Sequence, residues 1–133
     1  MKLLDSTFLI DFARKKIAAR EKLESLEHQT LYTTRINIFE VLTGLFSLKS
    51  ETERAIKLSE IQIFFNRLTI MELDETSSVK AAEISGALNK SGSSVDSADC
   101  LIAGIALSNG INTIVTRNAR DFEKIEGIKV ESY

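Results

Sequence analysis

Acidic side chains are the residues of this sequence best suited to carry chemistry. The chain has one histidine, His28, and one cysteine, Cys100. This excludes zinc sites and proton relays that need two imidazoles, and it excludes intramolecular disulfides. Acid–base or metal chemistry must therefore rest on carboxylates. The candidate positions are Asp5, Glu40, Asp96 with Asp99, and Asp121 with Asn118.

Helix capping explains several of these acids at least as well as catalysis does. Asp5 precedes an apolar stretch and can cap the helix expected there. Asp96 and Asp99 have the three-residue spacing of a capping box, and Asn118 and Asp121 repeat it. Acids in a first turn also suit the helix dipole. Taken singly, none of these positions indicates a catalytic site.

Glu40 is harder to explain by local structure. Its sequence neighbours are apolar, and no Lys or Arg lies three or four residues away on either side. A carboxylate that is buried alone costs several kcal/mol. We therefore expect Glu40 to pair with a distant cation, to face a wet crevice, or to ligate a metal ion.

The elements that must position these acids alternate between strands and helices. The first helix is expected to be capped by Ser6 or Thr7. Dense apolar residues in 35–48 predict a buried helix, and Ile56, Ile63 and Phe64 are expected to face the core from 51–66. Strands are predicted at 2–4, 31–34, 68–73, 113–116 and 128–130, and the helices after the first at 17–26, 35–48, 51–66, 76–90, 98–108 and 119–125.

This alternation with short connections predicts an α/β fold. We expect one domain over residues 1–133, with three α/β/α layers and a central parallel sheet of about five strands. Parallel sheets of this kind bind ligands outside the carboxyl ends of their strands. Asp5 and the segment 116–121 both follow predicted strands and are expected at that edge.

Composition narrows the functional classes. The 133 residues are 44 % hydrophobic and 27 % charged, which is ordinary globular usage, and the net charge of −2 excludes a polycation held to its partner by bulk positive charge. No apolar run approaches the length that spans a bilayer, and no cleavable signal is recognised. We therefore expect a cytoplasmic protein, with Cys100 in the core and His28 exposed.

Four motifs in order resemble those of the PIN-domain ribonucleases and, among them, the VapC toxins of toxin–antitoxin pairs. The resemblance extends over almost the whole chain, and the third motif is the most specific. Thr7 stands where the family frequently has asparagine. The motifs are Leu4–Asp11, Thr34–Gly44 with Glu40, Asp99–Ala103, and Thr116–Phe122.

The resemblance implies an endoribonuclease that depends on Mg²⁺ or Mn²⁺. Hard carboxylate oxygens suit these ions, which lower the pKa of a bound water and polarise a phosphate, so that no histidine base is needed. Whether one or two ions bind is left open. The acids carried over as metal-site and catalytic residues are Asp5, Glu40, Asp99 and Asp121.

Other polar residues in and near these motifs are expected to complete the acidic site, to contact its carboxylates or waters, or to cap helices. The fourth acidic place falls on Asn118 or Asp121; we expect Asp121, with Asn118 as a neutral helper. Asp96 either tunes the site or caps its helix. Residues that would hold carboxylates or waters are Ser6, Thr7, Thr116 and Asn118, although capping is the favoured role of Ser6 and Thr7.

RNA can approach an acidic site only if nearby cations hold its backbone. Arg117 and Arg120 lie beside Asp121, whereas a solvated helix end is the favoured explanation for Arg14 and Lys15. The candidate RNA-binding residues are Arg14, Lys15, Arg35, Arg117 and Arg120.

The resemblance also implies two protein partners, a second copy of the chain and a small antitoxin whose helix fills an apolar groove. Two alternatives remain open. One is a housekeeping PIN nuclease that processes ribosomal RNA, although the bare single-domain length favours the toxin. The other is a PIN-fold module that binds RNA or protein without cutting.

Overall fold

Five short parallel strands form the centre of the molecule. A computed structural model describes all residues, 1–133. The strands pair in the order β3-β2-β1-β4-β5, with Leu3 opposite Tyr32 and Leu4 opposite Val115. Their bounds are β1 (Lys2–Leu4), β2 (Leu31–Thr34), β3 (Thr69–Met71), β4 (Thr113–Val115) and β5 (Lys129–Glu131).

Both faces of the sheet are buried, because successive side chains of a strand point to opposite faces. Leu3 and Ile114 belong to one apolar cluster, and their chain neighbours Leu4 and Val115 belong to the other. All four side chains are fully buried. The short strands therefore anchor two separate cores.

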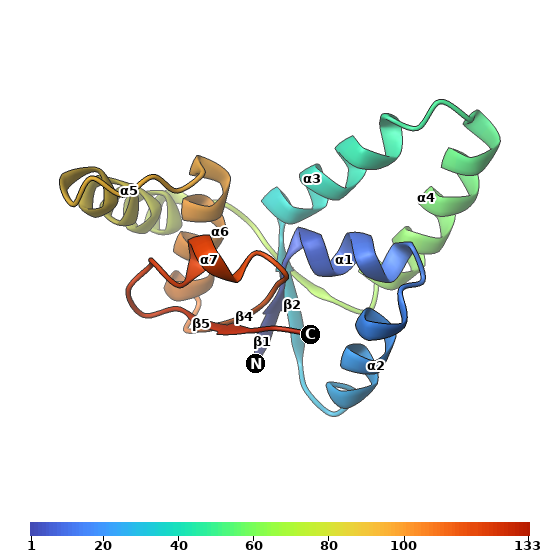
Figure 1. Cartoon of the computed structure of the whole chain (residues 1–133), viewed down its shortest axis with the longest axis horizontal. Coiled ribbons are helices and arrows are strands. Elements are labelled where there is room, and N and C mark those ends of the chain that lie inside the picture. Colours follow the sequence, from blue (N-terminus) through green and yellow to red (C-terminus); the bar gives the residue numbers. More distant parts are fainter.

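Helices cover both faces (Figure 1). One layer packs on Leu4 and Val115 and contains α1 (Ser6–Ala13), α2 (Ile17–Ser25), α3 (Arg35–Phe46) and α4 (Glu51–Phe65). The other packs on Leu3 and Ile114 and contains α5 (Glu75–Lys90), α6 (Ser97–Ser108) and α7 (Ala119–Phe122). A Cβ atom at Gly104 of α6 would lie 2.7 Å from Ala81 of α5, so this close helix contact requires glycine. The predicted α/β/α architecture with a five-stranded parallel sheet is confirmed.

The order of strands creates a switch point at β1. The chain proceeds from β1 to β2 and β3 on one side, and β4 and β5 lie on the other. Sheets of this kind bind ligands in the crevice where the strand order reverses, at the carboxyl ends of the strands. Asp5 follows β1 there, and its amide donates to the carbonyl of Val115 in β4 at 3.0 Å.

Several predicted details were wrong. Ile56 and Ile63 of α4 are 55 % and 67 % exposed, whereas Phe64 is buried as predicted. The helix α3 ends at Phe46, and it is not buried throughout, because Phe39 and Phe46 are 68 % and 61 % exposed. The strand predicted over 68–73 is shorter, because Leu68 still bonds back to the carbonyl of Phe65.

The other predicted details shift by a few residues or are confirmed. The last strand, β5, lies one residue later than predicted, and α7 ends at Phe122 rather than at residue 125. Cys100 is buried and His28 is exposed, as expected. No helix combines the length and apolar character needed to cross a bilayer.

Candidate active site

Asp5 is the most deeply buried acid at the carboxyl edge of the sheet, with 3 % exposure. Although it occupies the N-cap position of α1, its side chain makes no cap bond. Its Oδ1 accepts from the amide of Asn37 at 2.9 Å, and its Oδ2 accepts from the hydroxyls of Thr116 at 2.7 Å and Thr7 at 3.2 Å. Burial raises the pKa of Asp5 above its ordinary value, and these hydrogen bonds offset only part of the rise. Neutral donors therefore orient the carboxylate without a compensating positive charge.

Glu40 lies on α3, half-buried, and points to the same edge. Its Oε1 accepts from the hydroxyl of Ser6 at 2.6 Å, and no Lys or Arg forms an ion pair with it. Burial raises the pKa of Glu40, and the negative charges of Asp5 and Asp96 raise it further. The hydrogen bond from Ser6 acts in the opposite direction but does not cancel the rise. Of the three explanations offered by the sequence, pairing with a distant cation is therefore excluded.

The expected capping role of Ser6 and Thr7 was wrong. The helix begins at Ser6 itself, and the Ser6 hydroxyl spans two elements by donating to Glu40. The Thr7 hydroxyl lies between Asp5 and Thr116, 3.1 Å from the Thr116 hydroxyl. Both side chains thus contact the acidic site rather than the end of α1.

Asn37 connects these groups, and the sequence reasoning missed it. Its amide nitrogen donates to both Asp5 Oδ1 and Ser6 Oγ, at 2.9 and 3.0 Å. Its carbonyl oxygen accepts from the backbone and hydroxyl of Thr34 in a capping box that starts α3. The side chain is fully buried. The three-residue spacing from Thr34 was the available signal for the cap, but not for the bond to Asp5.

Asp99 lies in the first turn of α6, with 8 % exposure. Its Oδ2 accepts from the amide of Asn118 at 3.1 Å. Burial, together with the charges of Asp5, Asp96, Glu40 and Asp121, raises the pKa of Asp99 to about 7. The fold therefore brings all the predicted acids within electrostatic reach of Asp99.

The remaining acids fill different roles. Asp96 is exposed and caps α6 by accepting from the amide of Ala98 at 2.9 Å, so its capping explanation is confirmed. The same explanation was wrong for Asp99, whose side chain makes no cap bond. Asp121 is half-buried and lies 3.8 Å from the ammonium of Lys124.

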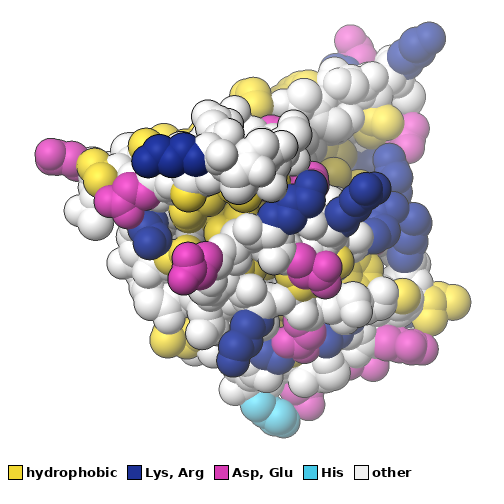
Figure 2. All heavy atoms as spheres, turned by 60° about the vertical axis from the view of Figure 1, so that its left-hand side comes forward, with side chains coloured by type: hydrophobic (Ala, Val, Ile, Leu, Met, Phe, Trp, Pro, Cys, Tyr) yellow, Lys and Arg dark blue, Asp and Glu magenta, His cyan; other side chains and the backbone are white.

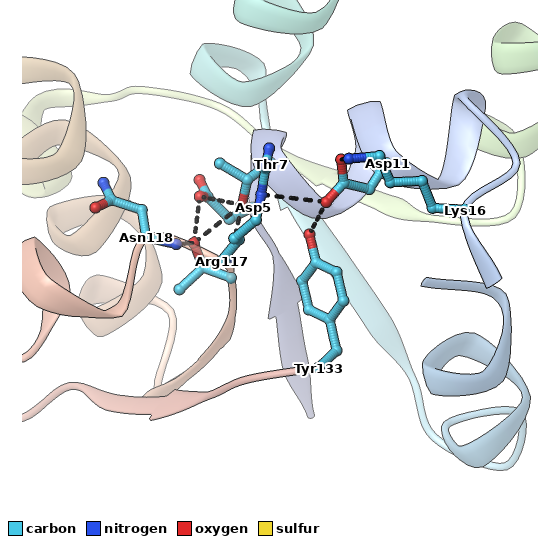
Figure 3. Close-up of polar contacts among 8 residues, drawn as sticks. Asp5, Thr7, Asp11, Lys16, Arg117, Asn118 and Tyr133 are labelled. Atoms are coloured by element: carbon cyan, nitrogen blue, oxygen red, sulfur yellow. Dashed lines mark hydrogen bonds and ion pairs between the residues drawn. The ribbon is translucent and has the colours of Figure 1, made fainter. Parts of the chain in front are cut away.

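The loop after β4 organises both sides of the site. Thr116 donates to Asp5, while its hydroxyl accepts from the backbone of Asn118 at 2.9 Å. Asn118 makes no side-chain cap bond with α7, and its amide bonds Asp99 instead. Figure 3 shows this loop beside Asp5 and Thr7. Of the two residues considered for the fourth place, Asn118 is the one that touches Asp99.

The donor set fits a hard divalent cation. No three His, Cys, Asp or Glu side chains are close enough together to hold one ion as they stand. Each of the three carboxylates is instead hydrogen-bonded to a neutral side chain. However, Asp5, Glu40 and Asp99 share one edge without a single ion pair to Lys or Arg. Oxygen-only sites of this kind suit Mg²⁺ or Mn²⁺, which keep several waters and need few protein ligands.

The predicted RNA-binding cations differ in whether they already pair with an acidic side chain. Arg35 makes a double contact with Glu72, from Nε at 3.0 Å and from Nη2 at 2.5 Å, and Arg117 pairs with Asp11. Arg14, Lys15 and Arg120 are exposed and make no ion pair. Figure 2, in which the side of the molecule with α5 is turned forward, shows acidic and basic side chains interspersed over much of this face and several Lys or Arg side chains gathered toward its right-hand side.

Known proteins resemble this chain over nearly its full length. A model of the PIN domain matches residues 2–128. The tRNA(fMet)-specific endonuclease VapC of Salmonella typhimurium is 29 % identical over 98 % of this chain and 96 % of its own. The DNA-bound VapBC complex of the same organism contains a chain with a TM-score of 0.85 and 26 % identity, covering 98 % of this chain and 96 % of that one.

A VapBC2 structure from Rickettsia felis has the same fold. Its TM-score is 0.86 at 23 % identity, and the match covers 99 % of this chain and 98 % of that one. The resemblance drawn from the four sequence motifs is therefore confirmed. This chain belongs to the PIN domain family, and the relatives described above are VapC-type proteins.

Proposed function

We propose that this chain is an endoribonuclease that hydrolyses RNA with Mg²⁺ or Mn²⁺ and acts as the toxin of a toxin–antitoxin pair. The observation that carries the proposal is the set of three acids at the switch point of the sheet, Asp5, Glu40 and Asp99, none of which has a cationic partner. Carboxylates that repel one another destabilise a fold, so three of them together without a cation favour a ligand that supplies the positive charge.

The side chains around these acids would keep them in place for catalysis. Asn37 and Thr116 fix the two oxygens of Asp5 from opposite sides, and Ser6 fixes Glu40. Because these donors are neutral, they orient the carboxylates without neutralising the negative charge of those carboxylates. A bound divalent cation would lower the pKa of a water molecule and polarise the scissile phosphate. Asp5, Glu40 and Asp99 would hold it, with Asn118 as the neutral neighbour.

RNA is the substrate class that the relatives support. The Salmonella protein is named for cleavage of tRNA(fMet), and a second relative, from Rickettsia felis, is named ribonuclease VapC1. Arg120 is exposed next to Asp121 and free of ion pairs, so it is suited to a backbone phosphate. Arg35 would have to leave Glu72 before it could make such a contact.

A protein partner fits the surface of α3 and α4. Phe39, Phe46, Ile56 and Ile63 are all more than half exposed, and apolar side chains that form a contiguous exposed patch mark a site where another protein binds. Structural relatives include VapBC complexes, and the one from Mycobacterium tuberculosis is described as a member of a family of toxin–antitoxin systems. An antitoxin and a second copy of the chain are therefore the proposed partners.

Cleavage of RNA by the purified chain tests the proposal. A single-stranded RNA labelled at its 5′ end should be cut internally in Mn²⁺ or Mg²⁺, EDTA should stop the reaction, and added Mn²⁺ should restore it. The matched control is Asp74→Asn, which changes an acid that caps α5 away from the site. Cleavage that persists in excess EDTA would contradict the mechanism, and RNA binding without any cleavage would support the non-catalytic module instead.

Growth of a bacterial host separates the toxin from the housekeeping nuclease. Expression of the wild-type chain should arrest growth, whereas expression of Asp99→Asn should not. Normal growth with the active wild-type chain would favour the ribosomal RNA nuclease.

A further inference from the structure

A second acid, Asp11, is buried on α1 and has no role in the site described so far. Its exposure is 2 %. Its Oδ2 accepts from the hydroxyl of Tyr133 at 2.7 Å and lies 3.2 Å from Nε of Arg117. Its Oδ1 lies 3.3 Å from the ammonium of Lys16 and makes no hydrogen bond. In Figure 3 these three partners converge on Asp11: Lys16 from the segment between α1 and α2, Arg117 from the loop after β4, and Tyr133 from the end of the chain.

The Asp11 carboxylate is charged and is held by several partners. Burial alone would raise the pKa of Asp11, but the hydrogen bond from Tyr133 and the positive charges of Lys16 and Arg117 outweigh it and hold the pKa below the ordinary value. The ring of Tyr133 packs edge-on against Phe8, with centroids 5.1 Å apart. Asp11 therefore presents a fixed negative charge to Arg117.

Arg117 stands between two residues that touch the metal-site acids. Thr116 bonds Asp5 and Asn118 bonds Asp99, while the backbone amide of Arg117 donates to Thr7 at 3.0 Å. Its side chain is 54 % exposed, and only its Nε is engaged, by Asp11. Its two Nη groups make no hydrogen bond.

The position of Asp11 decides which carboxylate this guanidinium meets. Asp11 follows Asp5 by six positions, which corresponds to a rise of about 9 Å along the axis of α1. A guanidinium released from Asp11 would be attracted to Asp5 and Asp99, which have no cation of their own. Pairing there would neutralise the carboxylates that a divalent cation needs.

We propose that Asp11 is a positioning residue that holds Arg117 away from the metal-site acids and leaves its Nη groups to a phosphate of the RNA backbone. Tyr133 supports Asp11 in this role. The inference rests on the proposed function, because it assumes that Asp5 and Asp99 serve a divalent cation.

Binding of Mn²⁺ to the metal-free protein tests the inference without RNA cleavage. Calorimetric titration should show that Asp11→Asn binds Mn²⁺ about five- to tenfold more weakly than the wild type, the lower part of the range for coupled sites. Arg117→Ala should bind Mn²⁺ at least as well as the wild type. The double variant should regain that affinity, because the competing guanidinium is gone.

Two further variants guard against a purely structural explanation. Lys16→Ala is the matched control, because it removes the other cation from Asp11 and leaves Arg117 in place. It should keep wild-type affinity for Mn²⁺. Tyr133→Phe keeps the ring packed on Phe8 and removes the hydrogen bond to Asp11, so it should also weaken Mn²⁺ binding. This variant tests the inference even if Asp11→Asn does not fold.

The outcomes separate this inference from the proposed function. Unchanged Mn²⁺ affinity in folded Asp11→Asn, or equally weak binding in that variant and in the double variant, would overturn the positioning role while leaving the metal site intact. A wild-type chain that binds no Mn²⁺ would overturn both.

Discussion

Replacing Asp99 by asparagine should make the metal-free protein more stable at neutral pH while removing its nuclease activity. The substitution keeps the shape of the side chain and an oxygen that can accept from Asn118. It also removes a negative charge that is repelled by the negative charges of Asp5, Asp96, Glu40 and Asp121. Stability and activity should therefore change in opposite directions.

The raised pKa of Asp99 sets the size of this effect. Its pKa is about 7 instead of 3.8, and each pKa unit is worth about 1.4 kcal/mol, so ionisation within the folded chain costs up to ~4 kcal/mol. Asp99 lies at an edge beside exposed Asp96, and solvent screening there reduces the expected gain in Asp99→Asn to about 1–2 kcal/mol.

The gain should depend on pH with a defined sign. Between about pH 4 and pH 7 the folded chain keeps the Asp99 proton that the unfolded chain has lost, so the free energy of unfolding of the wild type falls as pH rises. Below this window the residue is neutral in both states, and the variant and the wild type should be equally stable in this respect. Above pH 7 the full difference should appear.

Urea unfolding in EDTA, followed by circular dichroism from pH 5 to pH 8, measures this difference. The control is Asp74→Ala, which removes the cap of α5 and should lower stability at pH 7, because the pKa of Asp74 is below its ordinary value. The reasoning would be refuted if Asp99→Asn lowered the free energy of unfolding at pH 8 by about 1 kcal/mol or more. A lost helix cap costs about 0.5–2 kcal/mol. Such a decrease would mean that the Asp99 carboxylate stabilises the fold.

Three further outcomes are expected. Mn²⁺ should raise the melting temperature of the wild type, because it binds the native state, and the increment should shrink in Glu40→Gln. Arg120→Ala should weaken RNA binding and reduce the slope of log affinity against log salt by about 0.7, as expected when one phosphate contact to a single strand is lost; an unchanged slope would place the contact elsewhere. Asn37→Ala should destabilise the chain by about 1–3 kcal/mol, measured by urea unfolding, because the groups it bonds are buried and would lose a partner.

The architecture was predictable because it depends on short-range patterns. Apolar pairs such as Leu3 and Leu4 can be buried together only when helices cover both faces of a sheet, and the alternation of elements supplies those helices. The faces of α4 were less predictable. Its apolar residues include Ile56, Ile61, Ile63 and Phe64 and spread around the helix, so periodicity alone does not show that Ile61 and Phe64 are buried and the other two exposed.

The site was predictable in its acids but not in their partners. Asp5 follows a strand, and parallel strands collect such residues at one edge, so its placement needed no tertiary information. The bond of Asn37 to Asp5 spans 32 residues, and that of Tyr133 to Asp11 spans 122. Such contacts depend on how helices and loops pack, which no local pattern specifies. For the same reason the sequence could not reveal that Ser6 reaches Glu40.

The location of a bound metal ion is the most direct test of the central claim. A crystal of the wild-type chain soaked in Mn²⁺ should give an anomalous difference peak at the carboxyl ends of β1 and β4, with oxygens of Asp5 and Asp99 at about 2.0–2.4 Å from the ion. A crystal of Asp99→Asn treated in the same way should give a weaker peak or none. A Mn²⁺ ion bound elsewhere, or an empty acidic edge at a concentration that supports RNA cleavage, would contradict the account.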